Sequence, residues 1–265
     1  MGVITISRQY GAGGEEVAEK ISKVLDYRII ARKEIENKLI DIAGQQIAEK
    51  VIAEKAPGII ERITVDLRIW KNLLKESILS FAVDGNVLIL GRGSFDVFRD
   101  VPGVLDILVS GNLKQRVKYV IVKEGINSLH AEEKIERIDR ERSGFLNYYY
   151  GVDWPDPSLF HFSANPLRIG IDECAGAIEA LASFLYNRED FEKKRIKAIQ
   201  EKYFVTVVEN RIILSVGIDL DLFSLRVKEG NKVEIKFFNV PTEVREKAII
   251  TIGELMEGYT IHQMV

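Results

Sequence analysis

The sequence predicts an α/β fold, a parallel sheet flanked by helices, followed by a second and smaller α+β domain. Up to about residue 187, short apolar runs alternate with amphipathic stretches, which is typical of parallel strands covered by helices. The charged segment 187–197 separates this part from a region in which short runs are joined by turn residues. We therefore expect one domain over residues 1–190 and another over residues 195–265.

Because 46% of its 265 residues are hydrophobic, the chain can bury one large hydrophobic core or two smaller ones. The 37 Lys and Arg against 40 Asp and Glu give a net charge of −3, which supplies no electrostatic reason to bind nucleic acid or a membrane surface. The single cysteine, Cys174, excludes an internal disulfide, and no apolar run reaches membrane-spanning length. The N-terminal residues lack the features of a signal peptide, so we expect a soluble cytoplasmic protein.

The first domain should consist of strands separated by helices. Apolar runs predict strands at residues 3–6, 87–90 and 104–109, and a weaker one at 159–163. The long helical region between the first two of these is interrupted at residues 56–58, APG. Two helices carry an apolar face, formed by Val17, Ile21, Val24 and Leu25 near the N-terminus and by Cys174, Ile178, Leu181 and Leu185 at the end of the domain. Without a histidine nearby to activate it, Cys174 is expected to be a core residue and not a nucleophile.

The second domain is predicted to contain two hairpins. The runs YFVTVV and RIILSV, 203–208 and 211–216, are joined by Glu209 and Asn210, and a second pair follows at 222–227 and 232–238. Pro241 should open a helix, and YTIHQMV should form a last strand. This order loosely resembles the small BON (bacterial OsmY and nodulation) domain. With no cluster of metal ligands or nucleophiles in it, we expect a module for contacts with a protein partner or with a second copy of the chain.

The stretch VITISRQYGAGGEEVA, residues 3–18, runs from a strand through glycines into a helix. In such a turn, backbone N–H groups and the helix dipole can hold phosphate. A dinucleotide site would need another glycine near Glu16 and an acidic residue after the next short strand, where the chain has Ala31. A Walker loop can be laid on residues 8–15, but Gly14 then replaces the lysine and Glu15 the metal-binding hydroxyl. The stretch is a nucleotide site that works by other means, a degenerate one, or only a turn.

The first stretch, together with LILGRGSFDVFRDVPGVLDILVSG later in the chain, resembles the cytidylate kinase-like family over residues 3 to about 186. Members of this family typically begin with a strand, Ser-Arg, two variable residues and Gly-Ser-Gly-Gly. The positions that match this pattern are Ser7, Arg8, Gly11, Gly13 and Gly14. The resemblance implies that the family as a whole lacks this loop lysine. It also implies a P-loop kinase-like fold.

The resemblance implies transfer of phosphate from ATP, with Mg²⁺, to CMP or dCMP. The donor phosphates would lie at Ser7, Gly11, Ala12, Gly13 and Gly14. Arg92 in the GRGS segment would contact the nucleoside monophosphate, and the segment ERIDRERS resembles an arginine-rich lid, which would bring Arg137, Arg140 and Arg142 to the transferring phosphate. No residue is predicted to be a protein metal ligand.

Arg8 is the residue we expect to replace the loop lysine in part. A guanidinium is always protonated, and its planar fork can hold two phosphate oxygens. Phosphoryl transfer depends mostly on positioning and on charge stabilisation, so a cation from another position can serve.

Each assignment has a structural alternative. Glu133 with Arg137 and Glu136 with Arg140 have the spacing of ordinary helix ion pairs. Acidic residues in a first helical turn, such as Glu15, are favoured by the dipole without any ligand. The aromatic cluster of Tyr148, Tyr149, Tyr150 and Trp154 could stack a base or pack against the core. A non-catalytic nucleotide-sensing or assembly protein with a degenerate kinase fold therefore remains the alternative function.

Overall fold

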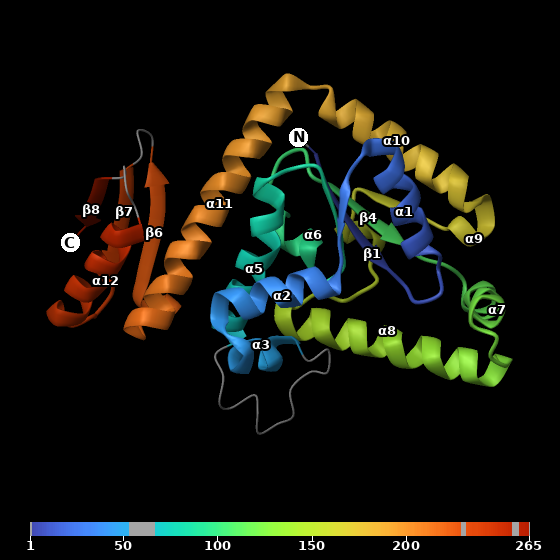
Figure 1. Cartoon of the computed structure of the whole chain (residues 1–265), viewed down its shortest axis with the longest axis horizontal. Coiled ribbons are helices and arrows are strands. Elements are labelled where there is room, and N and C mark those ends of the chain that lie inside the picture. The colour runs from blue at the N-terminus through green and yellow to red at the C-terminus, as the bar shows by residue number, and fades with distance from the viewer. Residues whose placement is uncertain (1, 53–66, 229–231, 256–259, 265) are drawn as a thin grey trace.

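The structure, a computed structural model, describes residues 2–52, 67–228, 232–255 and 260–264 (Figure 1). The break that the sequence predicts at 56–58 lies outside the described residues. A large sheet forms the centre of the molecule, and a small sheet lies at its C-terminal end (Figure 1). Among the described residues, no helix has both the length and the apolar character that crossing a membrane requires.

The large sheet has five strands, and every neighbouring pair in it is parallel. In the order β2-β3-β1-β4-β5, the strands are Arg28–Ile30, Val87–Leu90, Val3–Arg8, Leu105–Val109 and Phe162–Ala164. The α/β fold with a parallel sheet is thereby confirmed. The last strand begins later than predicted because Asp156 caps a short 3₁₀ helix, η1, at Pro157–Leu159.

Helices cover both faces of this sheet. Their bounds are α1 Gly14–Leu25, α2 Arg32–Ala43, α3 Gln45–Ile52, α5 Leu67–Val83, α6 Ser94–Val97, α7 Leu113–Glu124, α8 Ser128–Tyr150, α9 Pro166–Ile169 and α10 Ile171–Tyr186. On one face, α1 and α10 bury Val17, Ile21 and Ile178 against β1, β3 and β4. Cys174 is fully buried in the same cluster, which confirms it as a core residue. Val24, predicted to share the apolar face of α1, is exposed instead.

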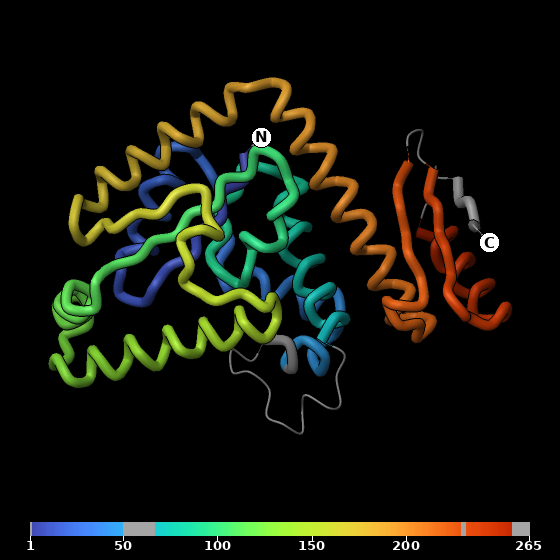
Figure 2. Tube along the Cα trace, turned by 180° about the vertical axis from the view of Figure 1, so that it is seen from behind, coloured from blue at the N-terminus to red at the C-terminus, as the bar shows by residue number. Residues whose placement is uncertain are grey.

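The opposite face is covered by α2, α5 and α6, together with the first half of α11, Glu189–Val216. Leu73 and Ile78 of α5 are fully buried there, and Ile199 of α11 joins the same cluster. Figures 1 and 2 both place α11 between the large-sheet body and the small C-terminal sheet. One helix thus belongs to two hydrophobic clusters, since Ile212 lies in the second one.

The hairpin predicted at residues 203–216 is wrong, because α11 runs through the whole segment. Its β-branched residues gave a strand signal, but burial between two bodies decides the conformation. The expected turn is part of the helix: Asn210 is buried and donates from its amide to Glu76 at 2.6 Å and to the Asn72 carbonyl at 3.2 Å. Asn72 donates in turn to Glu209 at 3.1 Å.

The C-terminal elements otherwise follow the prediction. Strands β6, Phe223–Lys228, and β7, Lys232–Phe237, pair antiparallel, and β8, Thr260–Met264, pairs parallel with β7. A short 3₁₀ helix, η2 Leu220–Leu222, precedes β6, and α12 Thr242–Leu255 begins after Pro241. The expected boundary between residues 190 and 195 falls inside α11. The division into domains 1–190 and 195–265 stays a prediction.

Replacing Ile199 by alanine is expected to destabilise the protein, because this side chain on α11 is fully buried against α5. The loss in free energy of unfolding should be about 2 to 5 kcal/mol, the range for truncating a large core residue. Ile250→Ala, on α12, is the matched control, since Ile250 is 61% exposed and its truncation should change stability by less than about 0.5 kcal/mol. Urea unfolding of both variants measures the difference, and equal losses would contradict the placement of α11.

Candidate functional site

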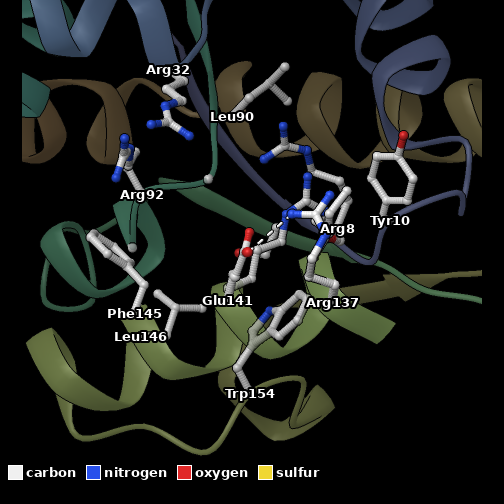
Figure 3. Close-up of a pocket in the computed structure, with 15 residues that line it drawn as sticks. Arg8, Tyr10, Arg32, Leu90, Arg92, Arg137, Glu141, Phe145, Leu146 and Trp154 are labelled. Carbon is white, nitrogen blue, oxygen red and sulfur yellow. Dashed lines mark hydrogen bonds and ion pairs between the residues drawn. The ribbon is translucent and has the colours of Figure 1, made fainter. Parts of the chain in front are cut away.

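A cavity of about 340 Å³ lies at the carboxyl ends of β1 and β3, where ligands of open parallel sheets bind (Figure 3). Helix α8 forms its opposite wall. The charged residues that line it are Arg8, Arg32, Arg92, Arg137, Arg142 and Glu141. Five guanidinium groups against one carboxylate make this cavity suited to an anion.

The cavity also has an apolar side. Leu90, at the end of β3, lines it together with Phe145, Leu146 and Trp154 from α8 and the segment after it (Figure 3). Phe145, Leu146 and Trp154 are themselves buried, and they belong to the hydrophobic core of the protein. The volume of the cavity and its mixed charged and apolar lining are typical of a site for a small molecule that combines a charged group with a ring.

Arg92 follows β3 between two glycines, as the sequence predicts, and it lines the cavity. Gly91, Arg92 and Gly93 have φ values of 75°, 56° and 71°, so three successive left-handed residues turn the chain from β3 into α6. Gly93 could not be replaced easily, because a Cβ there would lie 2.1 Å from the Tyr150 ring.

The Arg92 side chain is held on several sides and is only 5% exposed. Its guanidinium pairs with Glu36 of α2 and lies over the Phe145 ring, 5.2 Å from the ring centroid. The Tyr150 hydroxyl donates to the Arg92 carbonyl at 2.9 Å. Burial raises the pKa of this hydroxyl, so it stays protonated as the donor.

Glu36 and Arg32 were not identified from the sequence. Position 31, directly after β2, is an alanine, and the acidic side chain that reaches Arg92 comes from Glu36, one turn into α2. The same Glu36 oxygen, Oε1, also accepts from Nε of Arg32. The spacing of an arginine and a glutamate four residues apart, directly after a short strand, is the signal that could have found this pair.

The glycine loop has the predicted strand, turn and helix geometry. Gly11 and Gly13 are left-handed, with φ values of 72° and 81°, and Ala12 is buried. Gly14 is the first residue of α1, and it is required for another reason: a Cβ there would lie 2.6 Å from Cβ of Arg8. The Arg8 side chain therefore covers the position at which a Walker loop carries its lysine.

Arg8 connects the glycine loop with the cavity. Its Nε donates to Glu15 Oε1 at 3.0 Å, and its guanidinium lies against Gly91, where an added Cβ would be 2.6 Å from Nη1. Nη1 of Arg142 donates to the Arg8 carbonyl at 2.7 Å. Although burial raises the pKa of the Glu15 carboxyl, the charges of Arg8 and Arg142 hold it below its usual range.

The first turn of α1 already contains negative charge. Glu15 and Glu16 lie in this turn, beside the backbone N–H groups at the start of α1, and Glu16 also pairs with Lys123 of α7. A phosphate at these N–H groups would meet both carboxylates unless a divalent cation lay between them. The backbone N–H of Tyr10, another donor in the loop, is already bound, because it donates to Asp139 at 2.9 Å.

The predicted lid is part of the long helix α8, and it is divided between two surfaces. Arg137 and Arg142 line the cavity, but Arg140 is 70% exposed and pairs with Glu136 at 3.3 Å, outside it. Arg137 pairs with Glu141 at 3.1 Å and not with Glu133 as the spacing suggested. The structure thus brings Ser7, Arg8, Arg92, Arg137 and Arg142 to one cavity and leaves Arg140 and the loop from Gly11 to Gly14 off its lining.

A buried arginine beside the glycine loop was not predicted from the sequence. Arg116 of α7 donates from Nε to the Gly111 carbonyl and from Nη1 to the Tyr10 carbonyl, both at 3.0 Å. The same Nη1 pairs with Asp139 of α8. These contacts fix the loop to α7 and α8. No local pattern predicts those with Tyr10 and Asp139, because these partners lie 106 and 23 residues from Arg116 in the chain.

A family model places this site among known proteins. The description of that model is "Cytidylate kinase-like family", and it matches residues 3–165. The chain belongs to the cytidylate kinase-like family. The match contains the glycine loop, the Arg92 segment and α8, so every element that lines the cavity lies within the family's own region.

Relatives of this cytidylate kinase-like protein include two cytidylate kinases. The cytidylate kinase of Sulfurisphaera tokodaii is 25% identical over 185 residues, which are 69% of this chain and 96% of the relative. That of Methanopyrus kandleri is 27% identical over 199 residues, 71% of this chain and 96% of the relative. Part of this chain therefore has no counterpart in either relative. A crystal structure of an uncharacterized protein from Eubacterium ventriosum has a similar fold, with a TM-score of 0.54, 17% identity and coverage of 69% of this chain and 99% of that one.

Replacing Tyr150 by phenylalanine should weaken the support of the Arg92 segment, because the Arg92 carbonyl loses the hydroxyl that donates to it. The expected loss in free energy of unfolding is about 0.5 to 1.5 kcal/mol. Tyr203→Phe is the control, since within the described chain its hydroxyl has no hydrogen-bond partner. Urea unfolding compares the two variants, and a Tyr203→Phe loss as large as that of Tyr150→Phe would refute this role of the hydroxyl.

Proposed function

We propose that this cytidylate kinase-like phosphotransferase transfers the γ-phosphoryl group of ATP to CMP or dCMP. The observation that carries the proposal is the position of Arg8. Its guanidinium lies between the glycine loop and the Arg92 segment, in a chain that has no loop lysine. A cation at that place can contact donor and acceptor phosphates together.

The acceptor nucleotide would occupy the arginine-lined cavity. Arg92, Arg137 and Arg142 would hold its phosphate, and the apolar wall with Leu90 and Trp154 would take the base. The choice of cytosine is inferred from the family and its two relatives, because the apolar wall accommodates the ring without distinguishing one base from another.

The donor would bind as MgATP at the glycine loop, with Arg8 in the role of the lysine. Nε of Arg8 is committed to Glu15, which leaves its two terminal amino groups for phosphate oxygens. Mg²⁺ in such sites is held mainly by phosphate oxygens and by one or two carboxylates. Oε2 of Glu16 fits this need, because it is buried and has no hydrogen-bond partner within the described chain. When bound, Mg²⁺ would neutralise charge on the transferring phosphoryl group.

The second candidate function is a non-catalytic protein that binds nucleotides as a sensor or in an assembly. The carboxylates beside the first-turn N–H groups favour it, since they repel a phosphate that arrives without a cation. The C-terminal part would then supply contacts with a protein partner or a second copy. The BON-like character of that part stays a prediction. The observed order of a helix, a hairpin, a helix and a strand is compatible with it.

Replacing Arg92 by alanine should weaken CMP binding about 10- to 100-fold, the cost of losing a hydrogen bond to a charged group. Arg99→Ala, in the same segment, should leave CMP affinity unchanged, because Arg99 is exposed and pairs with Asp96. Titration calorimetry with CMP measures both variants. Equal affinity of the wild type and Arg92→Ala would place the acceptor elsewhere.

Replacing Arg8 by alanine should lower phosphoryl transfer to CMP by about 10² to 10³, the usual effect of removing one preorganised donor. Arg8→Lys should restore only part of the rate, since an ammonium group lacks the planar fork. Coupled ADP production with CMP and MgATP measures the rates. Equal rates for wild type and Arg8→Ala would reject Arg8 as the substitute cation.

A binding screen separates the two candidate functions. ATP and nucleoside monophosphates are titrated with and without Mg²⁺ into the wild-type protein. Binding without turnover for any monophosphate favours the sensor, and binding of ATP only with Mg²⁺ supports the cation-bridged donor site.

A further inference from the structure

A second cavity with several cationic side chains lies outside the site described above. It has a volume of about 480 Å³ and is formed by α5, α11 and β6. Its cationic side chains are Lys75, Lys202, Arg226 and Lys228. None of them belongs to the cavity of Arg8 and Arg92, and part of the wall, β6, comes from beyond the family's matched region.

Lys75 and Lys202 are the central pair of this cavity. They project from different helices, α5 and α11. Burial lowers the pKa of the Lys202 ammonium, and the positive charge of Lys75 lowers it further. Burial likewise lowers the pKa of the Lys75 ammonium. In the part of the chain that the structure describes, neither ammonium lies within 4.0 Å of a carboxylate oxygen. Two half-buried like charges therefore face one space without a close counter-ion.

The carboxylates nearby are mostly engaged elsewhere. Glu201, which also lines the cavity, pairs with Lys197 at 3.8 Å. Glu234 pairs with Lys228 at 3.5 Å and so balances the charge of that one cavity cation. Glu209 attracts Lys75 but accepts from Asn72 at 3.1 Å, and burial raises the pKa of its carboxyl. Asp100 and Asp96 also attract Lys202, but neither lines the cavity, so an excess of positive charge remains among its lining residues.

The walls also include apolar side chains. Ala198 and Val205 of α11 and Val227 of β6 line the space between the cations. Cations that converge from three elements suit a compact anion with several oxygens and more than one charge, and the phosphate group has both. The apolar wall and the volume leave room for a ring attached to it.

We propose that this cavity is a second ligand site, which binds a phosphate-bearing small molecule between Lys75, Lys202 and Arg226. Since its walls come from α5, α11 and β6, the bound anion would join the large-sheet body to the C-terminal sheet. The site does not depend on the function proposed for the Arg92 cavity.

The first test uses the wild-type protein and the reactivity of its lysines. A lowered pKa enlarges the unprotonated fraction, so an amine-acylating reagent modifies such lysines near neutral pH, and mass spectrometry locates the products. Inorganic phosphate and CMP are added in separate arms. We expect one or both to protect Lys75 and Lys202, while Lys197, exposed on the same helix α11, reacts unchanged. Protection by CMP alone identifies a nucleotide as the source of the phosphate, and protection by neither overturns the proposal.

The second test measures affinity. In the Arg92→Ala background, where CMP binding at the first cavity is weakened, the pair Lys75→Met and Lys202→Met should lower the affinity for the protecting anion at least about 10-fold. Methionine preserves the unbranched side chain and helix propensity, and Lys197→Met is the matched control. An equal loss in the control would show a general charge effect and would reject the site. Retained protection of Lys75 in Arg92→Ala separates this result from any failure of the proposed kinase function.

Discussion

The parallel pairing of β1 with β3 is the constraint on which the site depends. Ile6 is in register with Leu90, so Arg8 at the end of β1 and Arg92 just after β3 emerge at the same edge of the sheet. Two guanidinium groups so placed repel each other. Each is held by a carboxylate from a neighbouring helix, Glu15 for Arg8 and Glu36 for Arg92. The pairs are partly buried, so removal of either carboxylate would leave a guanidinium without its counter-ion.

The parts of this arrangement that the sequence predicts are local. The strand, the glycine turn and the helix follow one another within twenty residues, and the glycines around Arg92 adjoin a fully apolar strand. Such signals come from backbone conformation and periodicity, which adjacent residues determine. The contacts of Glu36 with Arg92 and of Arg116 with Tyr10 could not be predicted in the same way, because these partners lie 56 and 106 residues apart in the chain. Their roles follow from the order of strands in the sheet.

Helix α11 shows the opposite case, in which a local signal is overridden. The run YFVTVV has the β-branched composition of a strand, yet Thr206 and Val208 are buried within a helix. A helix that packs against α5 and against the C-terminal sheet has apolar residues on more than one face, so it lacks the regular amphipathic period by which helices are found. Buried Asn210, which the sequence places in a turn, is satisfied only because Asn72 and Glu76 lie on the helix opposite.

The absence of a lysine in the glycine loop has a steric explanation in this chain. Gly14 has no side chain, and the Arg8 side chain takes up that space, since any Cβ at position 14 would lie 2.6 Å from Cβ of Arg8. Glycine as the first residue of α1 therefore leaves room for the side chain at the end of β1 to lie over the loop. A lysine at position 14 would displace Arg8 from Gly91 and from Glu15 together. The positive charge beside the loop therefore comes from the strand, and the helix contributes the carboxylate that holds it in place.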